Sequence, residues 1–358
     1  MNSPNNSIWK KLKRNKTAMT GLVIISLAVF LCIFGYIIAP DHTPDADLQT
    51  VEIQSKPPGY TQQFLKIPLA HFEKTSLLQQ LFSGRPAEYH YLPIKRFSIS
   101  GDSLLVNKYV DEDTAVVQKY ALSAFPENIS RNIITKKYWL GTDAFGRDIL
   151  SRLIIGTRVS MAVGLIAMIV SLTIGILLGA VAGYYRGKKD TLIMWLVNIA
   201  WSIPTLLLVF AFTLALGKGF LQIFIAVGLT LWVSVARLVR GQVMAASSLE
   251  YVQAARALGF SNSRIIFKHI LPNIMGPVMV IAAGNFANAI IIEAGLSFLG
   301  IGVQPPGPSW GLMIRENYNL IITHNAVPAL IPGFAIMALV LAFNLLGTGL
   351  RDALDVKS

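Results

Sequence analysis

Residues 159–184 read VSMAVGLIAMIVSLTIGILLGAVAGY and contain no charged side chain. A helix of about 20 apolar residues is long enough to cross the hydrocarbon core of a bilayer. This run therefore predicts a transmembrane helix. Five similar runs lie elsewhere in the chain, at about residues 19–39, 191–216, 220–236, 276–301 and 327–350. Together they predict an all-α polytopic membrane protein with six transmembrane helices.

The composition also favours a membrane protein. Hydrophobic residues make up 53% of the chain and charged residues only 14%, whereas about 25% of the residues of a soluble domain are charged. Cys32 is the only cysteine, which excludes a disulfide within the chain and a cluster of cysteine ligands for a metal. Because Cys32 lies inside an apolar run, we expect a small buried side chain there.

The distribution of basic residues predicts the orientation of the spans. Lys and Arg are enriched in the cytoplasmic loops of membrane proteins, and six spans place both termini on the same side. With the termini inside, the cytoplasmic segments contain a large set of basic residues: Lys10, Lys11, Lys13, Arg14, Lys16, Arg186, Lys188, Lys189, Arg237, Arg240, Arg256, Arg264, Lys268, Arg351 and Lys357. The two short outer connections contain only Lys218 and Arg315. The net charge of +12 is thus explained by topology, and we expect no nucleic-acid partner.

Residues 1–40 are predicted to form a cytoplasmic N-terminus and the first transmembrane helix. A basic segment followed by an apolar run is also typical of a cleaved secretory signal. Three features favour an uncleaved anchor instead. The run is too long for a signal, it lacks an A-x-A-like end, and Pro40 follows Ala39 directly.

Residues 41–140 are predicted to form a small extracytoplasmic insert. The stretch is polar, and residues 96–100 and 103–106 alternate between apolar and polar side chains on either side of Gly101-Asp102. Alternation of this kind around a glycine-containing turn is typical of a β-hairpin. The insert is therefore expected to be β-rich. It either covers the membrane part as a structural element or contacts a partner that delivers a substrate.

Several residues inside the spans favour particular roles. Gly175, Gly179 and Gly183 are spaced four apart, which lets a neighbouring helix approach closely. Pro204 and Pro332 are expected to kink their helices. Glu293 is a carboxylate in an apolar run, and such groups usually face the protein interior or water. It either lines a translocation path or fixes a broken helix near Gly295 and Gly300.

The connection between the fourth and fifth spans has an unusual pattern. Residues 237–273 read RLVRGQVMAASSLEYVQAARALGFSNSRIIFKHILPN. Ala254, Ala255 and Leu258 form a face on a first short helix, which Gly259 ends because it permits a left-handed conformation. Ser261 or Asn262 caps a second helix, which Leu271-Pro272 ends. From the residues alone, this segment is either a compact knob for a partner or an ordinary amphipathic connector.

The same segment resembles the EAA loop of bacterial ABC importer permeases, on three sets of positions: Gln253-Ala254-Ala255, Gly259 and His269-Ile270-Leu271-Pro272. The resemblance implies a coupling helix that fits a groove in a separate ATPase subunit, within a coupling loop at residues 237–275. Gln253 replaces the usual Glu and His269 the usual Ile, while Glu250 lies one turn earlier and offers an acidic contact. The implied ATPase-coupling residues are Glu250, Tyr251, Gln253, Ala254, Ala255, Arg256, Gly259, His269, Leu271 and Pro272.

Three further stretches are similar to the C-type subunits of oligopeptide and dipeptide permeases. They are residues 140–160, which begin LGTDAFGRD, residues 297–311, which begin SFLGIGVQPP, and residues 343–355. The resemblance implies a five-helix ABC permease core at 141–358 in the inner membrane of a bacterium. It also implies a heterodimer with a second permease, two ABC ATPase subunits or domains that bind ATP and Mg²⁺, and an extracytoplasmic substrate-binding protein.

The residues before and after the second span suggest positioning roles. Asp148 and Arg152 have the i,i+4 spacing of an ion pair on a helix. Trp139 and Trp310 suit the outer membrane–water boundary.

No pattern in the chain predicts an enzyme or a bound cofactor. A phosphate-binding loop needs G-x-x-x-x-G-K-[ST], and the string from Gly183 to Lys189 has neither the spacing nor the final hydroxyl. We therefore expect ATP and Mg²⁺ on partner subunits. The resemblance favours peptides as substrate, with nickel chelates, glutathione or antimicrobial peptides as alternatives. A secondary transporter driven by an ion gradient would need more ionisable residues than Glu293 at mid-membrane, and a non-transporting scaffold is the other class.

Overall fold

The computed structural model describes residues 4–69, 75–125, 129–217, 219–323 and 325–354. Lys218 and Lys357, which enter the orientation argument, lie outside the described residues. The chain divides into two compact units. The first, here the helical unit, comprises residues 1–29, 160–304 and 335–358; the second, the sheet unit, comprises residues 30–159 and 305–334.

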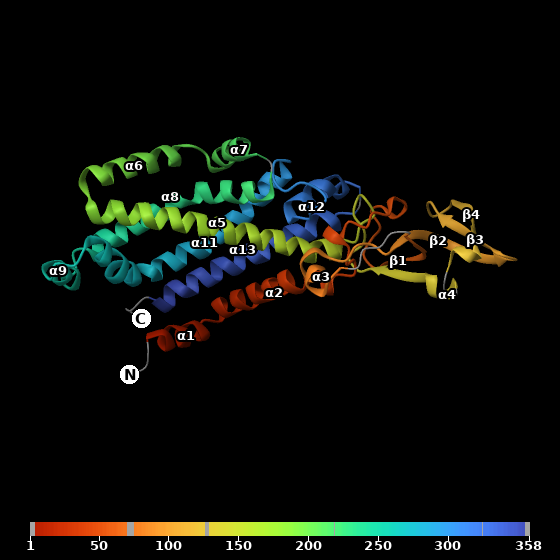
Figure 1. Cartoon of the computed structure of the whole chain (residues 1–358), viewed down its shortest axis with the longest axis horizontal. Helices are drawn as coiled ribbons and strands as arrows, with labels where there is room; N and C mark the ends of the chain where they lie inside the picture. Colours follow the sequence, from red (N-terminus) through yellow and green to blue (C-terminus); the bar gives the residue numbers. More distant parts are fainter. Residues whose placement is uncertain (1–3, 70–74, 126–128, 218, 324, 355–358) are drawn as a thin grey trace. The chain divides into compact units, whose positions relative to one another are not determined.

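Long apolar helices dominate the chain (Figure 1). The helices outside the sheet region are α1 (Pro4–Arg14), α2 (Lys16–Ile38), α5 (Ile149–Tyr185), α6 (Gly187–Ser202), α7 (Thr205–Leu216), α8 (Phe220–Ala246), α9 (Glu250–Ala257), α10 (Asn262–Arg264), α11 (Leu271–Phe298), α12 (Trp310–Asn317) and α13 (Val327–Leu354). Among the described residues, five helical segments are long and apolar enough to cross a membrane, or six if α6 and α7 count as one span. The chain is thus a mostly helical, multi-pass membrane protein.

The predicted kink at Pro204 is a complete break between α6 and α7, which meet at 99°. Ile203 is extended, with φ −92° and ψ 129°. The ring of a proline disfavours the helical conformation in the residue before it, so the break falls at this residue. Pro332, in contrast, lies inside α13, which continues through it.

The glycines of α5 give close packing within the helical unit. A Cβ atom built on Gly175 would lie 2.4 Å from Val235 Cβ, and one on Gly179 would lie 2.6 Å from the carbonyl oxygen of Ala236. Any larger residue there would push α8 away from α5. The predicted close approach is confirmed, and Figure 1 shows the two helices side by side.

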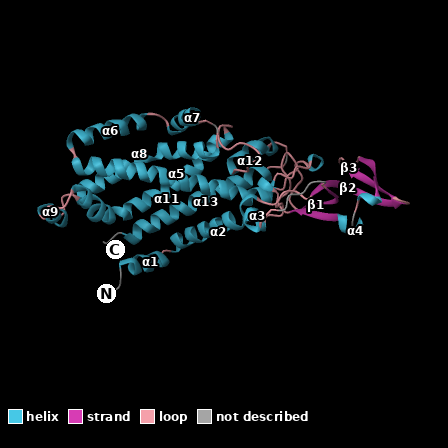
Figure 2. Cartoon of the chain, viewed as in Figure 1, coloured by secondary structure: helices cyan, strands magenta, loops and turns pink. Residues whose placement is uncertain are grey.

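The sheet unit contains a five-stranded antiparallel sheet (Figure 2). Its strands are β1 (Tyr60–Pro68), β2 (Tyr89–Ser100), β3 (Ser103–Tyr109), β4 (Ala115–Ala121) and β5 (Ile133–Tyr138), in the order β4-β3-β2-β1-β5. Ser100 pairs with Ser103 across Gly101-Asp102, and Gly101 has φ +59°, so the predicted hairpin is confirmed. Two short helices, α3 (Leu77–Ser83) and α4 (Ile129–Asn132), accompany the sheet. The strands contribute buried Leu65, Ile94 and Leu104 to one hydrophobic core.

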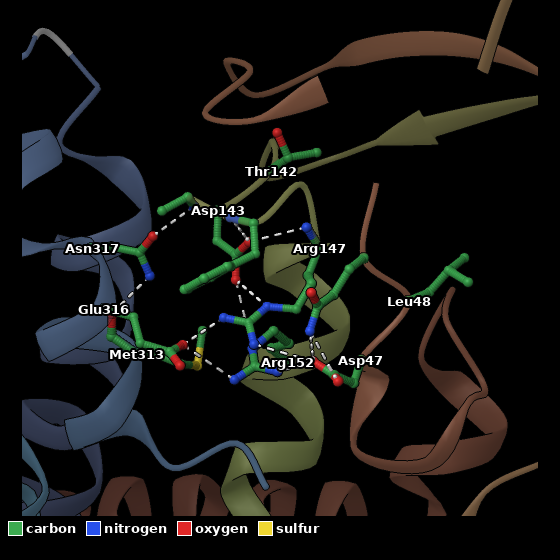
Figure 3. A network of polar contacts seen from close by, with 12 residues as sticks. Asp47, Leu48, Thr142, Asp143, Arg147, Arg152, Met313, Glu316 and Asn317 are labelled. Atoms are coloured by element: carbon green, nitrogen blue, oxygen red, sulfur yellow. Dashed lines mark hydrogen bonds and ion pairs between the residues drawn. The ribbon is translucent and has the colours of Figure 1, made fainter. Parts of the chain in front are cut away.

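A buried network of charges orders the sheet unit where α5 begins (Figure 3). Arg147 Nε donates to Asp143 Oδ2 at 2.7 Å, and its Nη2 donates to Glu316 Oε2 at 2.5 Å. Arg152 is fully buried, and its Nη2 donates to the same Glu316 oxygen at 3.4 Å. Asp47 Oδ1 lies 3.2 Å from Arg147 Nη1 and 3.7 Å from Arg152 Nη1.

Two predicted positioning roles are wrong. Asp148 does not pair with Arg152, because it caps α5 by accepting hydrogen bonds from the backbone N–H of Ser151, at 2.8 Å, and from the Ser151 hydroxyl. Trp310 does not lie at an exposed boundary: it is only 4% exposed and its Nε1 donates to the carbonyl oxygen of Leu153 at 3.0 Å. Gly156 has no side chain there, which leaves room for the indole. Trp139 is exposed, as the boundary role requires.

Candidate functional site

The segment from α9 to the start of α11, residues 250–272, forms a compact projection of the helical unit that we call the knob. Only two side chains of α9, Val252 and Ala255, are buried. They join an apolar cluster with Val243 of α8 and with Ile265 and Ile270 beyond the turn. Because so few side chains anchor α9, most of its surface is free for other contacts.

Gly259 ends α9 as the sequence predicts. Its φ is +74°, a left-handed conformation that costs glycine little. The backbone N–H of Gly259 donates to the carbonyl oxygen of Arg256 at 3.0 Å, and that of Phe260 donates to the carbonyl oxygen of Ala255 at 3.2 Å. These two bonds form a Schellman motif. The chain therefore reverses at a defined angle.

The prediction that Leu271-Pro272 ends the second helix is wrong. Ser261 precedes α10, although its side chain makes no capping bond, and helical structure then continues from Asn262 to Phe298. Between α10 and α11, residues Ile265–Ile270 form a π-helical turn. A proline in a first helical turn loses no intrahelical hydrogen bond, and the wider turn before Pro272 lets the helix run on.

The knob presents apolar side chains to its surroundings. Leu258 is 73% exposed and Phe267 57%, and Leu249, the residue directly before the knob, is 50% exposed. Exposed apolar groups gathered on one projection are typical of a protein interaction site. These three residues are absent from the predicted coupling set, although apolar residues in a polar loop are a signal in the sequence.

Most of the predicted coupling residues lie on this exposed surface. Glu250, Tyr251, Gln253, Ala254, Arg256, Gly259 and Pro272 are exposed, whereas Ala255 is buried and His269 and Leu271 are partly buried. His269 stacks on Phe260 with ring centroids 5.7 Å apart. The structure thus assigns Ala255 and His269 to the inner packing of the knob rather than to its surface.

Tyr184, at the end of α5, contacts both parts of the knob. Its hydroxyl donates to Asn262 Oδ1 at 2.8 Å. Arg256 Cζ of α9 lies 5.4 Å from the Tyr184 ring centroid, within the range of a cation–π contact. The knob is therefore connected to α5 as well as to α8 and α11.

Glu293, predicted either for a path or for a broken helix, is fully buried in α11. The Ser297 hydroxyl donates to Glu293 Oε1 at 2.6 Å and accepts the backbone N–H of Val303 at 3.0 Å. Gly300 follows the end of α11 with φ +83°. These contacts favour the second role, in which Glu293 holds the turn after α11.

A polar cavity of about 200 Å³ lies where α6 and α7 break apart. Its polar lining comes from three helices, α7, α8 and α11: Thr205, Thr230, Ser234, Asn285 and Asn288. Asn285 is buried and donates to Ser171 Oγ at 3.2 Å and to the carbonyl oxygen of Leu231 at 3.3 Å. This cavity was not predicted from the sequence, although amides inside an apolar run, such as Asn285 and Asn288, are a visible signal. Across the described ranges, no three His, Cys, Asp or Glu side chains are grouped so as to hold a metal ion.

Comparison with known proteins gives two family matches. Residues 175–357 match the family described as "Binding-protein-dependent transport system inner membrane component". Residues 3–58 match the family described as "N-terminal TM domain of oligopeptide transport permease C". The two matches leave residues 59–174, which contain the sheet, outside both families.

Named relatives are similar at about 40% identity. The glutathione transport system permease protein GsiD of Pectobacterium atrosepticum is 42% identical over 62% of this chain and 73% of that protein. The oligopeptide transport system permease protein OppC of Bacillus subtilis is 40% identical over 62% of this chain and 73% of that protein. The di/tripeptide transport system permease protein DppC of Pseudomonas aeruginosa is 44% identical over the same shares.

These matches define a class of protein, the permease subunits of ABC importers. The chain belongs to the family of binding-protein-dependent transport system inner membrane components. It is a multi-pass inner-membrane subunit, and ATP hydrolysis belongs to separate ATPase subunits. Importers of this family work with such ATPases and with a substrate-binding protein.

Proposed function

We propose that this chain is a peptide permease subunit whose knob, residues 250–272, docks in a groove of an ATPase subunit. The observation that carries the proposal is the exposed apolar surface around Leu258, at the end of a short helix whose only buried side chains are Val252 and Ala255. A partner that covers Leu258 removes its apolar surface from water, at about 25 cal/mol per Å². Exposed Glu250 and Arg256 flank that surface and supply polar contacts at its rim.

In our proposal, the contacts of the knob pass its movement on to the membrane helices. Val252 packs on Val243 of α8, Tyr184 of α5 holds Asn262, and the π turn runs directly into α11. A displacement of the knob by ATP-driven closure of the ATPases therefore reaches three membrane helices together. In our proposal this displacement switches the permease between inward- and outward-facing states.

In the proposed membrane topology, the chain has six spans, with α6 and α7 as one broken span, and both termini lie in the cytoplasm. The basic residues near the knob and at the N-terminus favour this orientation. It places the insert at residues 41–140 on the extracytoplasmic side, where a binding protein delivers substrate. The complete importer then contains a second permease subunit and two ABC ATPases that bind ATP and Mg²⁺, and this chain binds neither.

The substrate we propose is a di- or oligopeptide. The relatives carry the names of dipeptide, di/tripeptide, oligopeptide and glutathione permeases. Amides and hydroxyls around Asn288 line the polar cavity at the α6–α7 break, and such groups hydrogen-bond a peptide backbone. Glutathione is the alternative because one group of relatives carries that name.

The docking claim is tested with Leu258→Glu in the complete transporter. The carboxylate would be buried in an apolar contact without a partner, which costs several kcal/mol, so we expect uptake of dialanine to fall about tenfold or more. Val117→Glu is the matched control because Val117 is an equally exposed apolar residue on β4. Unchanged uptake and unchanged ATPase stimulation in Leu258→Glu would refute the docking site. Uptake driven by an ion gradient without ATP would refute the class of mechanism.

A further inference from the structure

The sheet unit contains two cavities that the transport function described above does not use. A cavity of about 200 Å³ is bounded by Pro40, Asp41, Leu48, Lys136 and Asp148, among others. A cavity of about 360 Å³ shares the first four of these residues. The larger one falls within the range of small-ligand pockets, about 300–1,000 Å³. Because the two share walls, they lie next to each other, and together we call them the double cavity.

The walls of the double cavity carry charges of both signs. Three carboxylates and four cationic side chains line it: Asp41, Glu88, Asp148, Lys66, Arg85, Lys136 and Lys137. The end that contains only the smaller cavity has Asp148 and the exposed Lys137, whose Nζ lies 4.0 Å from the Trp139 ring centroid. The end that contains only the larger cavity has Lys66, Arg85 and Glu88. An arrangement of this kind suits a ligand with an ammonium group at one end and a carboxylate at the other.

Asp148 has an oxygen that no described residue satisfies. The side chain is only 6% exposed. Its Oδ2 accepts both hydrogen bonds from Ser151, whereas Oδ1 accepts none from the residues that the structure describes. A buried carboxylate oxygen without a donor is costly. An ammonium group in the smaller cavity would satisfy it with a charge-assisted hydrogen bond.

The other charged groups of the smaller cavity do not need a ligand in the same way. Asp41 Oδ1 accepts from the backbone N–H and hydroxyl of Thr43, and its Oδ2 accepts from the backbone N–H of Leu48. Lys136 Nζ lies 3.5 Å from the Tyr91 ring centroid. Burial lowers the pKa of Lys136 to about 8 and raises the pKa of Asp148. Each of these two groups would therefore be stabilised in its charged form by an opposite charge in the cavity.

We propose that the double cavity binds the free amino terminus of a short peptide at Asp148, with the peptide carboxylate directed toward the cationic side chains Lys136, Lys66 and Arg85. The inference rests on the proposed peptide transport and deepens it. It makes the sheet unit a peptide-holding site of the permease itself, separate from the binding protein.

The test measures dialanine and trialanine binding to the complete transporter in lipid nanodiscs without its binding protein, by calorimetry. We expect the wild type to bind dialanine saturably, and we expect the affinity to fall about tenfold or more in Asp148→Asn. Asparagine keeps the helix-capping oxygen but removes the charge. Lys119→Gln is the matched control, because Lys119 is an exposed cation on β4 outside the cavity lining, and it should bind as the wild type does. N-acetyl-dialanine, which lacks the ammonium group, should bind the wild-type protein about tenfold or more weakly than dialanine does. This comparison tests the site without a variant.

Two results would overturn the site. The first is no saturable binding of dialanine to the wild type. The second is that Asp148→Asn binds dialanine, and the wild type binds N-acetyl-dialanine, as tightly as the wild type binds dialanine. Dialanine uptake by the complete transporter with its binding protein separates this inference from the proposed function. Uptake that persists without binding in the nanodisc would refute only the double cavity. Absence of uptake of any peptide would refute the proposed function and the peptide assignment together.

Discussion

The knob and the buried charge network are stabilised in different ways. The knob is built from residues 250–272, close in sequence, and is held mainly by apolar contacts of Val252 and Ala255. The network joins Asp47, Arg147 and Glu316, which are far apart in sequence, by charged contacts. The first leaves apolar surface exposed, whereas the second has its arginines buried, with at most 3% of either side chain exposed.

This difference separates a surface for a partner from an internal frame. An element with two buried side chains gains little from its own packing, so its position depends on what it contacts. A buried ion network is intolerant of change, because removing one member leaves the others charged and unpaired. We therefore expect damage to the network to affect folding, and damage to the knob surface to affect transport.

Arg152→Met should give the largest effect on stability. It removes a fully buried charge that lies within 4.0 Å of Asp47, Asp143 and Glu316, and we expect a loss of about 3–5 kcal/mol. Thermal unfolding of the purified chain in detergent measures it. The matched control is Arg85→Met, which breaks an exposed pair at 3.7 Å worth about 0–1 kcal/mol. Equal unfolding temperatures for the two variants would contradict the claim that the buried charge network stabilises the fold.

Lys136→Met should change how stability depends on pH. The folded pKa of Lys136 is about 8, below its ordinary value of 10.5, because burial disfavours the charged form. Between pH 8 and 10.5 the unfolded chain binds the proton that the folded chain has released, so wild-type stability rises with pH there. The variant should be the more stable protein at pH 7, by at most on the order of 3 kcal/mol, and this advantage should vanish near pH 10.5. Unfolding measured from pH 7 to 10.5 checks the sign, and a constant difference would contradict it.

Gly259→Ala should give a smaller effect, confined to the knob. Nothing lies within 4 Å of a Cβ atom built there, so the cost comes from φ +74° alone, about 1–2 kcal/mol. Hydrogen exchange of α9 in the purified chain measures the loss of protection. Gly259→Asn is the matched control, since asparagine tolerates this conformation. If the amide hydrogens of α9 exchange at the same rate in both variants, the left-handed turn at Gly259 does not determine the stability of α9.

The knob could be predicted largely from the sequence because its structure is local. A glycine after a helical run predicts the reversal at Gly259, and the spacing to Leu271-Pro272 marks the family. The end of the knob, where the chain continues into α11, could not be predicted as well. Whether Pro272 ends a helix depends on the preceding turn, and the π geometry of Ile265–Ile270 leaves no trace in residue spacing.

The network shows why the rest could not be predicted. The i,i+4 spacing of Asp148 and Arg152 suggests a pair, but the start of α5 needs a cap, and Asp148 fills that position. Two partners of Arg152 are Asp47 and Glu316. Each lies more than 100 positions from Arg152 in the sequence, and no local rule relates residues so far apart. The β-hairpin at Gly101 was visible in the alternation, whereas the order of the five strands depends on tertiary contacts.

The central claim is that the exposed apolar face of the knob contacts an ATPase subunit. The most direct measurement places the photo-crosslinking amino acid p-benzoylphenylalanine at position 258, and separately at position 117, in the complete transporter. We predict an adduct with the ATPase subunit from position 258, none from position 117, and a change in adduct yield when ATP is bound. Absence of an ATPase adduct at position 258, with the transporter active, would contradict the account.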